Sequence, residues 1–172
     1  MKATRKRTKK SATLRVGIYS EGTLRPADLA LSLSNELACV HLTRKDRGRV
    51  TTLGTLAGAY SDYNDEGIRD SSRAYDEVYA MAYDYLCDIA NNYLPPYAYF
   101  GSSEGDGACI GVWPDVDGVL YDVLQNDLEN LDKDGYPPKG YAGLAADISD
   151  HGNVTLWNVR RGGRMVEVWG VV

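Results

Sequence analysis

The stretch that decides the fold is Arg69–Leu94, RDSSRAYDEVYAMAYDYLCDIANNYL, which predicts the central helix of the chain. Its apolar side chains recur every three or four residues, a spacing that places them on one face of an α-helix. They are Tyr75, Val78, Tyr79, Ala82, Leu86, Ile89 and Tyr93. Pro95 and Pro96 follow and end the helix, because a proline disfavours helical geometry in the residue before it. The apolar face must be covered, so the flanking segments have to supply a core.

The segments before this helix predict one strand and two further helices. Leu14–Tyr19 alternates apolar with small or polar residues, as a strand does. Thr23–Val40 carries leucines at helical spacing and a proline where a first turn tolerates it. Arg44–Arg49 is expected to be a polar connector, and Thr51–Tyr60 a short helix weakened by its glycines.

The segments after the central helix predict strands and one more helix. Tyr97–Phe100 and Ala108–Trp113 read as two strands joined by a glycine-rich loop. Asp115 is suited to cap a helix that runs on to Leu131. Three strands are expected at Leu144–Ile148, Val154–Val159 and Met165–Val171. Together these elements predict an α+β fold: an antiparallel sheet with a C-terminal three-stranded meander, packed by about three helices.

Size and composition favour one folded domain behind a short tail. The chain has 172 residues, 44% of them hydrophobic and 25% charged, as in ordinary globular domains. We expect residues 1–11 to form a disordered basic tail and residues 12–172 a single α+β domain. No apolar run approaches the roughly 20 residues of a membrane span, so no membrane partner is expected.

The cysteines and the N-terminal residues indicate a cytoplasmic protein. Cys39, Cys87 and Cys109 are widely spaced among apolar residues, so they are expected to be reduced and buried in the core. The basic residues at the N-terminus are followed by no apolar stretch of the kind that a secretory signal needs. No feature of the sequence specifies the oligomeric state.

The charges are divided between the two ends of the sequence. Residues 1–50 hold 12 Lys and Arg against 4 Asp and Glu, a net charge of +8. Residues 51–172 hold 7 against 20, a net charge of −13. This asymmetry predicts a basic arm that can bind nucleic acid or an acidic surface, attached to a body that repels nucleic acid.

An acidic stripe on the central helix is the first candidate binding surface. At 3.6 residues per turn, four carboxylates fall within about 40° of one another along about 27 Å of helix. They are Asp70, Glu77, Asp84 and Asp88. Tyr83 and Tyr85 lie beside them, and tyrosine is common at protein interfaces. The stripe is therefore predicted to bind a partner, for example as a mimic of nucleic acid, although a solvated helix face with Arg73 paired to Glu77 explains the same pattern.

The basic tail is the second candidate binding surface. Six Lys and Arg residues among the first ten can neutralise phosphates and give a salt-dependent affinity that is independent of sequence. They are Lys2, Arg5, Lys6, Arg7, Lys9 and Lys10. Solubility and charge balance are the alternative explanation of this composition.

Five short motifs resemble a family of small proteins of bacteriophages and bacterial mobile elements. They are Gly22–Asp28 (GTLRPAD), Pro95–Gly101 (PPYAYFG), Glu104–Gly107 (EGDG), Asp150–Leu156 (DHGNVTL) and Glu167–Trp169 (EVW). No chemistry is assigned to that family, so the resemblance implies a phage setting and a compact fold and transfers no catalytic or binding residue. After Gly107 this chain departs from the family pattern of acidic and aromatic residues.

Catalytic and metal-binding motifs are weak throughout. Asp150 and His151 fit a turn between two strands better than a catalytic dyad, and no nucleophile elbow is present. Glu104 and Asp106 offer two carboxylates without a complete ligand set, so no metal and no cofactor is expected. We therefore favour a phage or mobile-element protein that binds and inhibits or modulates a host protein, such as a nucleic-acid-handling defence complex. The alternatives are a nucleic-acid-binding accessory protein and a small hydrolase or metal-dependent nuclease.

Overall fold

The computed structural model describes residues 11–61 and 72–171, and these residues form an α+β structure. They fold as two compact units, of which unit 1 contains residues 11–61, 72–94 and 100–112. Unit 2 contains residues 95–99 and 113–171. The chain therefore passes from one unit to the other three times. The α+β prediction is confirmed, and the predicted tail lies outside the described residues except for Ser11.

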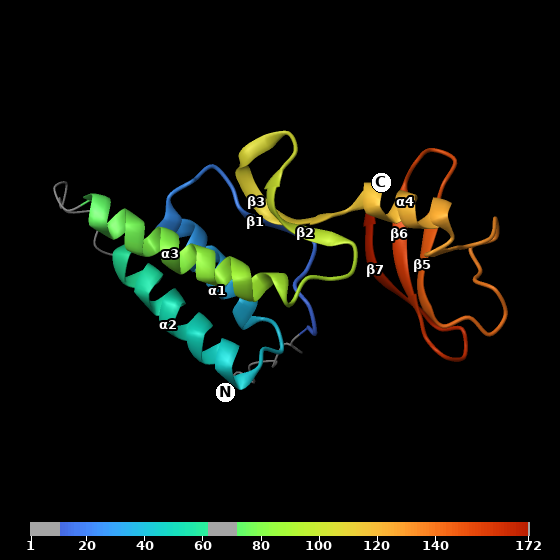
Figure 1. Cartoon of the computed structure of the whole chain (residues 1–172), viewed down its shortest axis with the longest axis horizontal. Helices are drawn as coiled ribbons and strands as arrows, with labels where there is room; N and C mark the ends of the chain where they lie inside the picture. Colours follow the sequence, from blue (N-terminus) through green and yellow to red (C-terminus); the bar gives the residue numbers. More distant parts are fainter. Residues whose placement is uncertain (1–10, 62–71, 172) are drawn as a thin grey trace, which may run out of the picture. The chain divides into compact units, whose positions relative to one another are not determined.

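Three helices form the larger part of unit 1. They are α1 (Pro26–Ala38), α2 (Arg44–Ser61) and α3 (Ser72–Asn91), and α1 packs against both of the others (Figure 1). Among the core leucines, Leu33 of α1 and Leu86 of α3 are at most 1% exposed. The predicted apolar face of the central helix is thus buried in large part, although Val78 was wrongly included, because it is 47% exposed.

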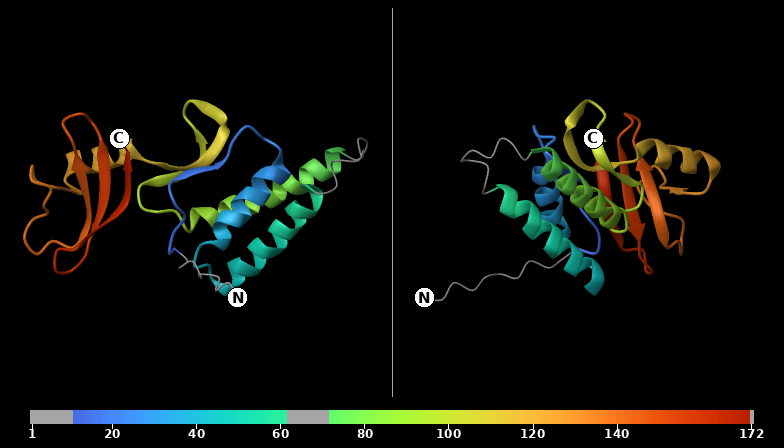
Figure 2. Two further views of the ribbon diagram at one scale, coloured as in Figure 1. Left: turned by 180° about the vertical axis from the view of Figure 1, so that it is seen from behind. Right: turned by 60° about the vertical axis from the view of Figure 1, so that its left-hand side comes forward.

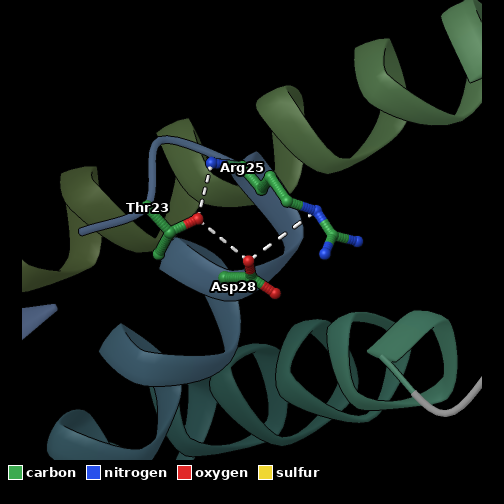
Figure 3. Close-up of polar contacts among 3 residues, drawn as sticks. All are labelled: Thr23, Arg25 and Asp28. Atoms are coloured by element: carbon green, nitrogen blue, oxygen red, sulfur yellow. Dashed lines mark hydrogen bonds and ion pairs between the residues drawn. The ribbon is translucent and has the colours of Figure 1, made fainter. Parts of the chain in front are cut away.

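The start of α1 is held by a side-chain cluster in the Gly22–Asp28 segment. The Thr23 hydroxyl donates to Asp28 Oδ2 at 3.0 Å and accepts from the Arg25 backbone N–H at 3.1 Å (Figure 3). The guanidinium of Arg25 lies 3.7 Å from the same carboxylate oxygen. A carboxylate in the first turn also interacts favourably with the helix dipole, so this motif has a structural role.

The prediction of a polar connector over Arg44–Arg49 is wrong, because α2 begins at Arg44. Thr43 acts as the cap: its Oγ1 accepts from the Asp46 backbone N–H at 3.1 Å and donates to the Asp46 carboxylate at 2.7 Å. A Thr followed three residues later by an acidic residue is close to the capping-box pattern, so this signal was present in the sequence.

The first sheet contains three strands in the order β1-β3-β2, with β1 (Gly17–Ser20) antiparallel to β3 (Asp106–Pro114). The strand β2 (Ala98–Ser103) lies on the other side of β3. Phe100 joins this sheet to the helices, because its ring centroid lies 6.2 Å from that of Tyr19 and 6.4 Å from that of Tyr83. Both strands of the predicted hairpin are longer than expected and leave only Glu104 and Gly105 between them.

Unit 2 holds α4 (Val116–Gln125) and the second sheet, with α4 on one side of that sheet (Figure 2). Its strands are β4 (Glu129–Asn130), β5 (Gly143–Ile148), β6 (Val154–Val159) and β7 (Met165–Val171). The last three form the predicted antiparallel meander, while β4 pairs parallel with β5 and was not foreseen. A two-residue strand is too short to leave a periodic signal in the sequence.

The helix α4 begins as predicted and ends earlier. The Asp115 carboxylate accepts from the Gly118 backbone N–H at 2.9 Å, which is the expected N-cap. Asn126 then adopts the left-handed conformation at φ 61°, where the carbonyls of Asp122 and Val123 accept from its N–H. Asparagine tolerates this geometry, so the helix ends six residues before Leu131. Leu128 and Leu131 are buried, but outside the helix.

Two glycines of α2 give a test of the packing between α1 and α2. A Cβ at Gly54 would lie 2.9 Å from the Cβ of Ser34, which is 5% exposed, whereas a Cβ at Gly48 would meet nothing within 4 Å. We expect Gly54→Ala to destabilise the protein by about 1–3 kcal/mol, because overpacking outweighs the gain in helix propensity. We expect Gly48→Ala to stabilise it by up to about 1 kcal/mol. Urea denaturation followed by circular dichroism measures both; stabilisation by Gly54→Ala would contradict the close approach.

Candidate binding surfaces

Asp150 and His151, the residues considered for catalysis, are exposed in the turn between β5 and β6. The turn predicted between β5 and β6 is present: it closes with the Gly152 N–H donating to the Ser149 carbonyl at 2.9 Å, and Gly152 takes a φ of 81°. The Ser149 hydroxyl accepts from the backbone N–H groups of His151 and Asn153. This hydroxyl therefore caps a turn, and the side chain of His151 is exposed beside it.

Both carboxylates of the glycine-rich loop are exposed, and one of them accepts a hydrogen bond within the loop. The Asp106 Oδ1 accepts from the Ala108 backbone N–H at 2.9 Å, and Glu104 is exposed at the tip of the turn. Within residues 11–61 and 72–171, no three His, Cys, Asp or Glu side chains gather as a metal site would require.

The three cysteines differ in their surroundings. Cys109 is buried and Cys87 half-buried, whereas Cys39 is exposed, so the expectation that Cys39 lies in the core is wrong. Cys39 is the residue that caps the end of α1, past the face that its leucines bury. Burial raises the pKa of the Cys87 thiol to about 11, even though a hydrogen bond with Tyr83 lowers it. Cys87 is therefore a protonated thiol at neutral pH and a poor nucleophile.

The outer face of α3 carries both carboxylates and exposed apolar side chains. Glu77, Asp84 and Asp88 are exposed and fall within about 40° of one another around the helix. An apolar ridge adjoins this acidic stripe, formed by Val78, Met81 and Tyr85 at 47, 57 and 58% exposed. The ridge lies between the acidic stripe and the buried face of the helix. We call the six residues together the α3 face.

The sequence analysis missed part of the α3 face. Val78 was assigned to the buried stripe and Met81 was not considered, yet these two residues and Tyr85 follow one another at spacings of three and four. A helical projection would have placed Met81 next to Asp84 and Asp88, away from Leu86. That angular position is the available signal.

Tyr83 lies apart from the α3 face. It is half-buried, its ring stacks at a tilt of 58° against Phe100, and burial together with Cys87 raises the pKa of its hydroxyl above the usual range. Asp70 and the six basic residues of positions 1–10 lie outside the described residues.

A second surface forms where α2 begins. Arg44, Lys45, Arg47 and Arg49 are all exposed within its first two turns. The Tyr93 hydroxyl, at the end of α3, donates to the Asp46 carboxylate at 2.8 Å and accepts from the Thr43 N–H at 3.0 Å. These bonds hold the first turn of α2 to the end of α3.

Comparisons with known proteins give no family: no family model, no curated protein and no solved structure matches this chain. Among the described helices, none is long and apolar enough to cross a membrane.

The hydrogen bonds to Asp46 predict an acid-dependent contribution to stability. Thr43 first and Tyr93 second lower the pKa of Asp46 below its ordinary value of 3.8. The ionised carboxylate therefore stabilises the fold above that value, and the stabilisation is lost as the pH falls through the lower, folded-state pKa. We expect Asp46→Asn to lower the melting temperature at neutral pH. The difference from the native chain should shrink below about pH 4.

Melting curves followed by circular dichroism over an acid pH series make this measurement. Tyr93→Phe keeps the ring and removes one of the two hydrogen bonds, so it should show a smaller version of the same pH dependence. A difference between Asp46→Asn and the native chain that stays constant across the series would contradict the role of the ionised carboxylate.

Proposed function

We propose that this protein is a binding protein that docks on another protein through the α3 face. The observation that carries the proposal is the apolar ridge of Val78, Met81 and Tyr85, which stands exposed beside three carboxylates on one helix. Large apolar side chains are stabilised by about 1.5–3 kcal/mol each when they are fully buried. A neighbouring protein that covers the ridge supplies this burial.

The mixture of side chains on the α3 face is that of an interface. Exposed Met and Tyr are enriched at protein interfaces, and a Tyr at the centre of a patch often contributes more to affinity than its neighbours. Acidic residues at the margin of such a patch remain hydrated and set the rate and specificity of association. Met81 and Tyr85 are thus the proposed anchors, and Asp84 and Asp88 the steering charges.

The charge of the α3 face defines the chemistry of its partner. Glu77 and Asp88 are 11 residues apart, which is about 16 Å along the helix axis. A partner that complements them presents basic side chains around an apolar centre. Proteins that handle nucleic acid carry basic surfaces of this kind, and a protein docked there would compete with the nucleic acid. Inhibition or modulation of such a protein is the activity we propose.

The inference that the partner comes from a bacterial host rests on the sequence resemblance to phage and mobile-element proteins. The motifs that carry this resemblance support the choice of lysate in which the partner is first sought. They do not support the choice of the α3 face, which rests on side-chain exposure and charge alone.

Capture from a nuclease-treated bacterial lysate tests the proposal when it is made with matched variants. The tagged native chain should retain a protein partner in near-stoichiometric amount. Met81→Ala combined with Tyr85→Ala should reduce retention of that partner by about tenfold or more, because both proposed anchors are removed. The control combines Tyr121→Ala with Leu124→Ala, which removes equally large side chains of α4 that are 63 and 77% exposed.

Charge reversal on the same partner provides a second arm. Asp84→Lys with Asp88→Lys should slow association strongly at low salt, whereas Asp127→Lys with Asp150→Lys changes two exposed carboxylates of unit 2 by the same charge. A partner retained equally by all four variants would contradict docking through the α3 face.

A further inference from the structure

The start of α2 presents an exposed basic surface that the proposed function does not use. Arg44, Lys45 and Arg49 are exposed, and neither a hydrogen bond nor an ion pair engages their side chains in the described part of the chain. Arg47 is also exposed, and its guanidinium donates to the Leu42 carbonyl at 3.2 Å. We call these four residues the α2 basic surface.

The α2 basic surface keeps a net positive charge, because the ionised carboxylate of Asp46 offsets only one of its four positive charges. Asp46 is the one acidic residue of Arg44–Ser61, and its Oδ2 accepts hydrogen bonds from Thr43 Oγ1 at 2.7 Å and Tyr93 at 2.8 Å. The Thr43 hydroxyl in turn accepts from the Asp46 N–H. The charged side chains, and not the amide groups of the helix end, are therefore what a ligand would meet.

Ser11, the first residue that the structure describes, is bonded to the segment that leads into α2. The Ser11 carbonyl accepts from the His41 N–H at 2.9 Å, and the Ser11 N–H donates to the Cys39 carbonyl at 3.2 Å. Lys10 precedes Ser11 in the sequence, and His41 is three residues before Arg44. Six further Lys and Arg residues precede Ser11 in the sequence.

We propose that the α2 basic surface binds the phosphate backbone of nucleic acid without reading its sequence. Lys and Arg side chains that neutralise phosphates release counterions, and this release dominates non-specific affinity. Lys45 and Arg49 lie one turn apart on the same side of the helix, about 6 Å along its axis, which spans about two base-pair steps of a duplex. Neighbouring phosphates of one strand are within reach of this spacing.

The remainder of the exposed face of α2 favours nucleic acid over a membrane surface. Helices that lie on membranes pair basic residues with large apolar side chains that enter the lipid. Here Thr51, Thr52 and Thr55 follow the basic residues, and their hydroxyls donate to backbone carbonyls four residues earlier at 2.9 to 3.1 Å. A Cβ at Gly48 would meet nothing within 4 Å, so the surface around Gly48 is open. The exposed threonines make this face largely polar, although Leu56, at 38% exposed, adds a large apolar side chain to it. A single leucine is far less than the apolar face with which such helices enter lipid.

This inference is independent of the docking proposal, because the two surfaces have opposite charge. The acidic stripe of the α3 face repels nucleic acid, whereas the α2 basic surface attracts it. Loss of one activity would therefore leave the other in place.

Fluorescence anisotropy with a labelled duplex oligonucleotide of arbitrary sequence tests the proposal on the full chain. The native protein should bind with an affinity that falls steeply with salt. The triple variant Arg44→Gln, Lys45→Gln, Arg49→Gln should bind on the order of tenfold more weakly at low salt. Its slope of log affinity against log salt should be smaller by about three, one for each phosphate that the variant no longer neutralises.

Three further proteins make the result specific. Arg160→Gln, Arg161→Gln, Arg164→Gln removes the same charge from exposed positions near the turn between β6 and β7 and should bind like the native chain. Arg44→Lys with Arg49→Lys keeps the charge and should retain the native salt slope. Deletion of residues 1–10 separates the N-terminal segment from the α2 basic surface. Melting curves confirm that the first triple variant is folded.

Several outcomes would overturn the proposal. The first is that the native chain does not bind the oligonucleotide, and the second is that both triple variants lose affinity equally. The third is that the α2 triple variant keeps the native affinity, which is lost only on deletion of residues 1–10. The fourth is that the native chain binds phosphatidylserine vesicles more tightly than the oligonucleotide.

Discussion

The hydroxyl group of Tyr93 makes the contact on which the arrangement of unit 1 depends. It links the end of α3 to the start of α2, across 50 residues, by accepting from the Thr43 N–H and donating to the Asp46 carboxylate. The backbone carbonyl of the same residue accepts from the Leu14 N–H at 2.8 Å, just before β1. One residue therefore joins the entry of the chain into unit 1 with two of its helices. Because Tyr93 is half-buried, these bonds are partly screened from water.

Two helices of unit 1, α2 and α3, carry surfaces of opposite charge, and this difference bears on function. The first two turns of α2 act as a basic surface, because four exposed basic side chains there outnumber the single carboxylate of Asp46. The α3 face carries three carboxylates beside an apolar ridge. A protein with both surfaces can hold nucleic acid at one and a basic protein at the other. Both proposals concern the handling of nucleic acid, and each rests on its own side chains.

The sequence predicted the elements whose periodicity is long or whose ends carry strong signals. The strands β5, β6 and β7 and the N-cap of α4 at Asp115 are confirmed because alternation and capping are local properties. The start of α2 was missed because glycine and charge suggested a loop, whereas Thr43, Asp46 and the distant Tyr93 stabilise a helix there. Tertiary contacts of this kind leave no local pattern.

The candidate surfaces were predicted in outline only. The carboxylates of the acidic stripe were identified from helical spacing, and Glu77, Asp84 and Asp88 are exposed. Met81 could have been placed by helical projection, whereas the exposure of Val78 depends on how α1 packs against α3, which spacing alone does not determine. The α2 basic surface was missed because Arg44–Arg49 was predicted to be a connector, and the contact of Tyr93 with Asp46 that holds this helical turn leaves no local pattern.

Nuclear magnetic resonance of the isotopically labelled full chain, titrated with the duplex oligonucleotide, tests the separation of the two surfaces most directly. The account predicts that amide resonances of Arg44–Thr55 shift progressively, while those of Glu77–Asp88 stay in place. Shifts centred on Glu77–Asp88, or spread evenly over both helices, would contradict it.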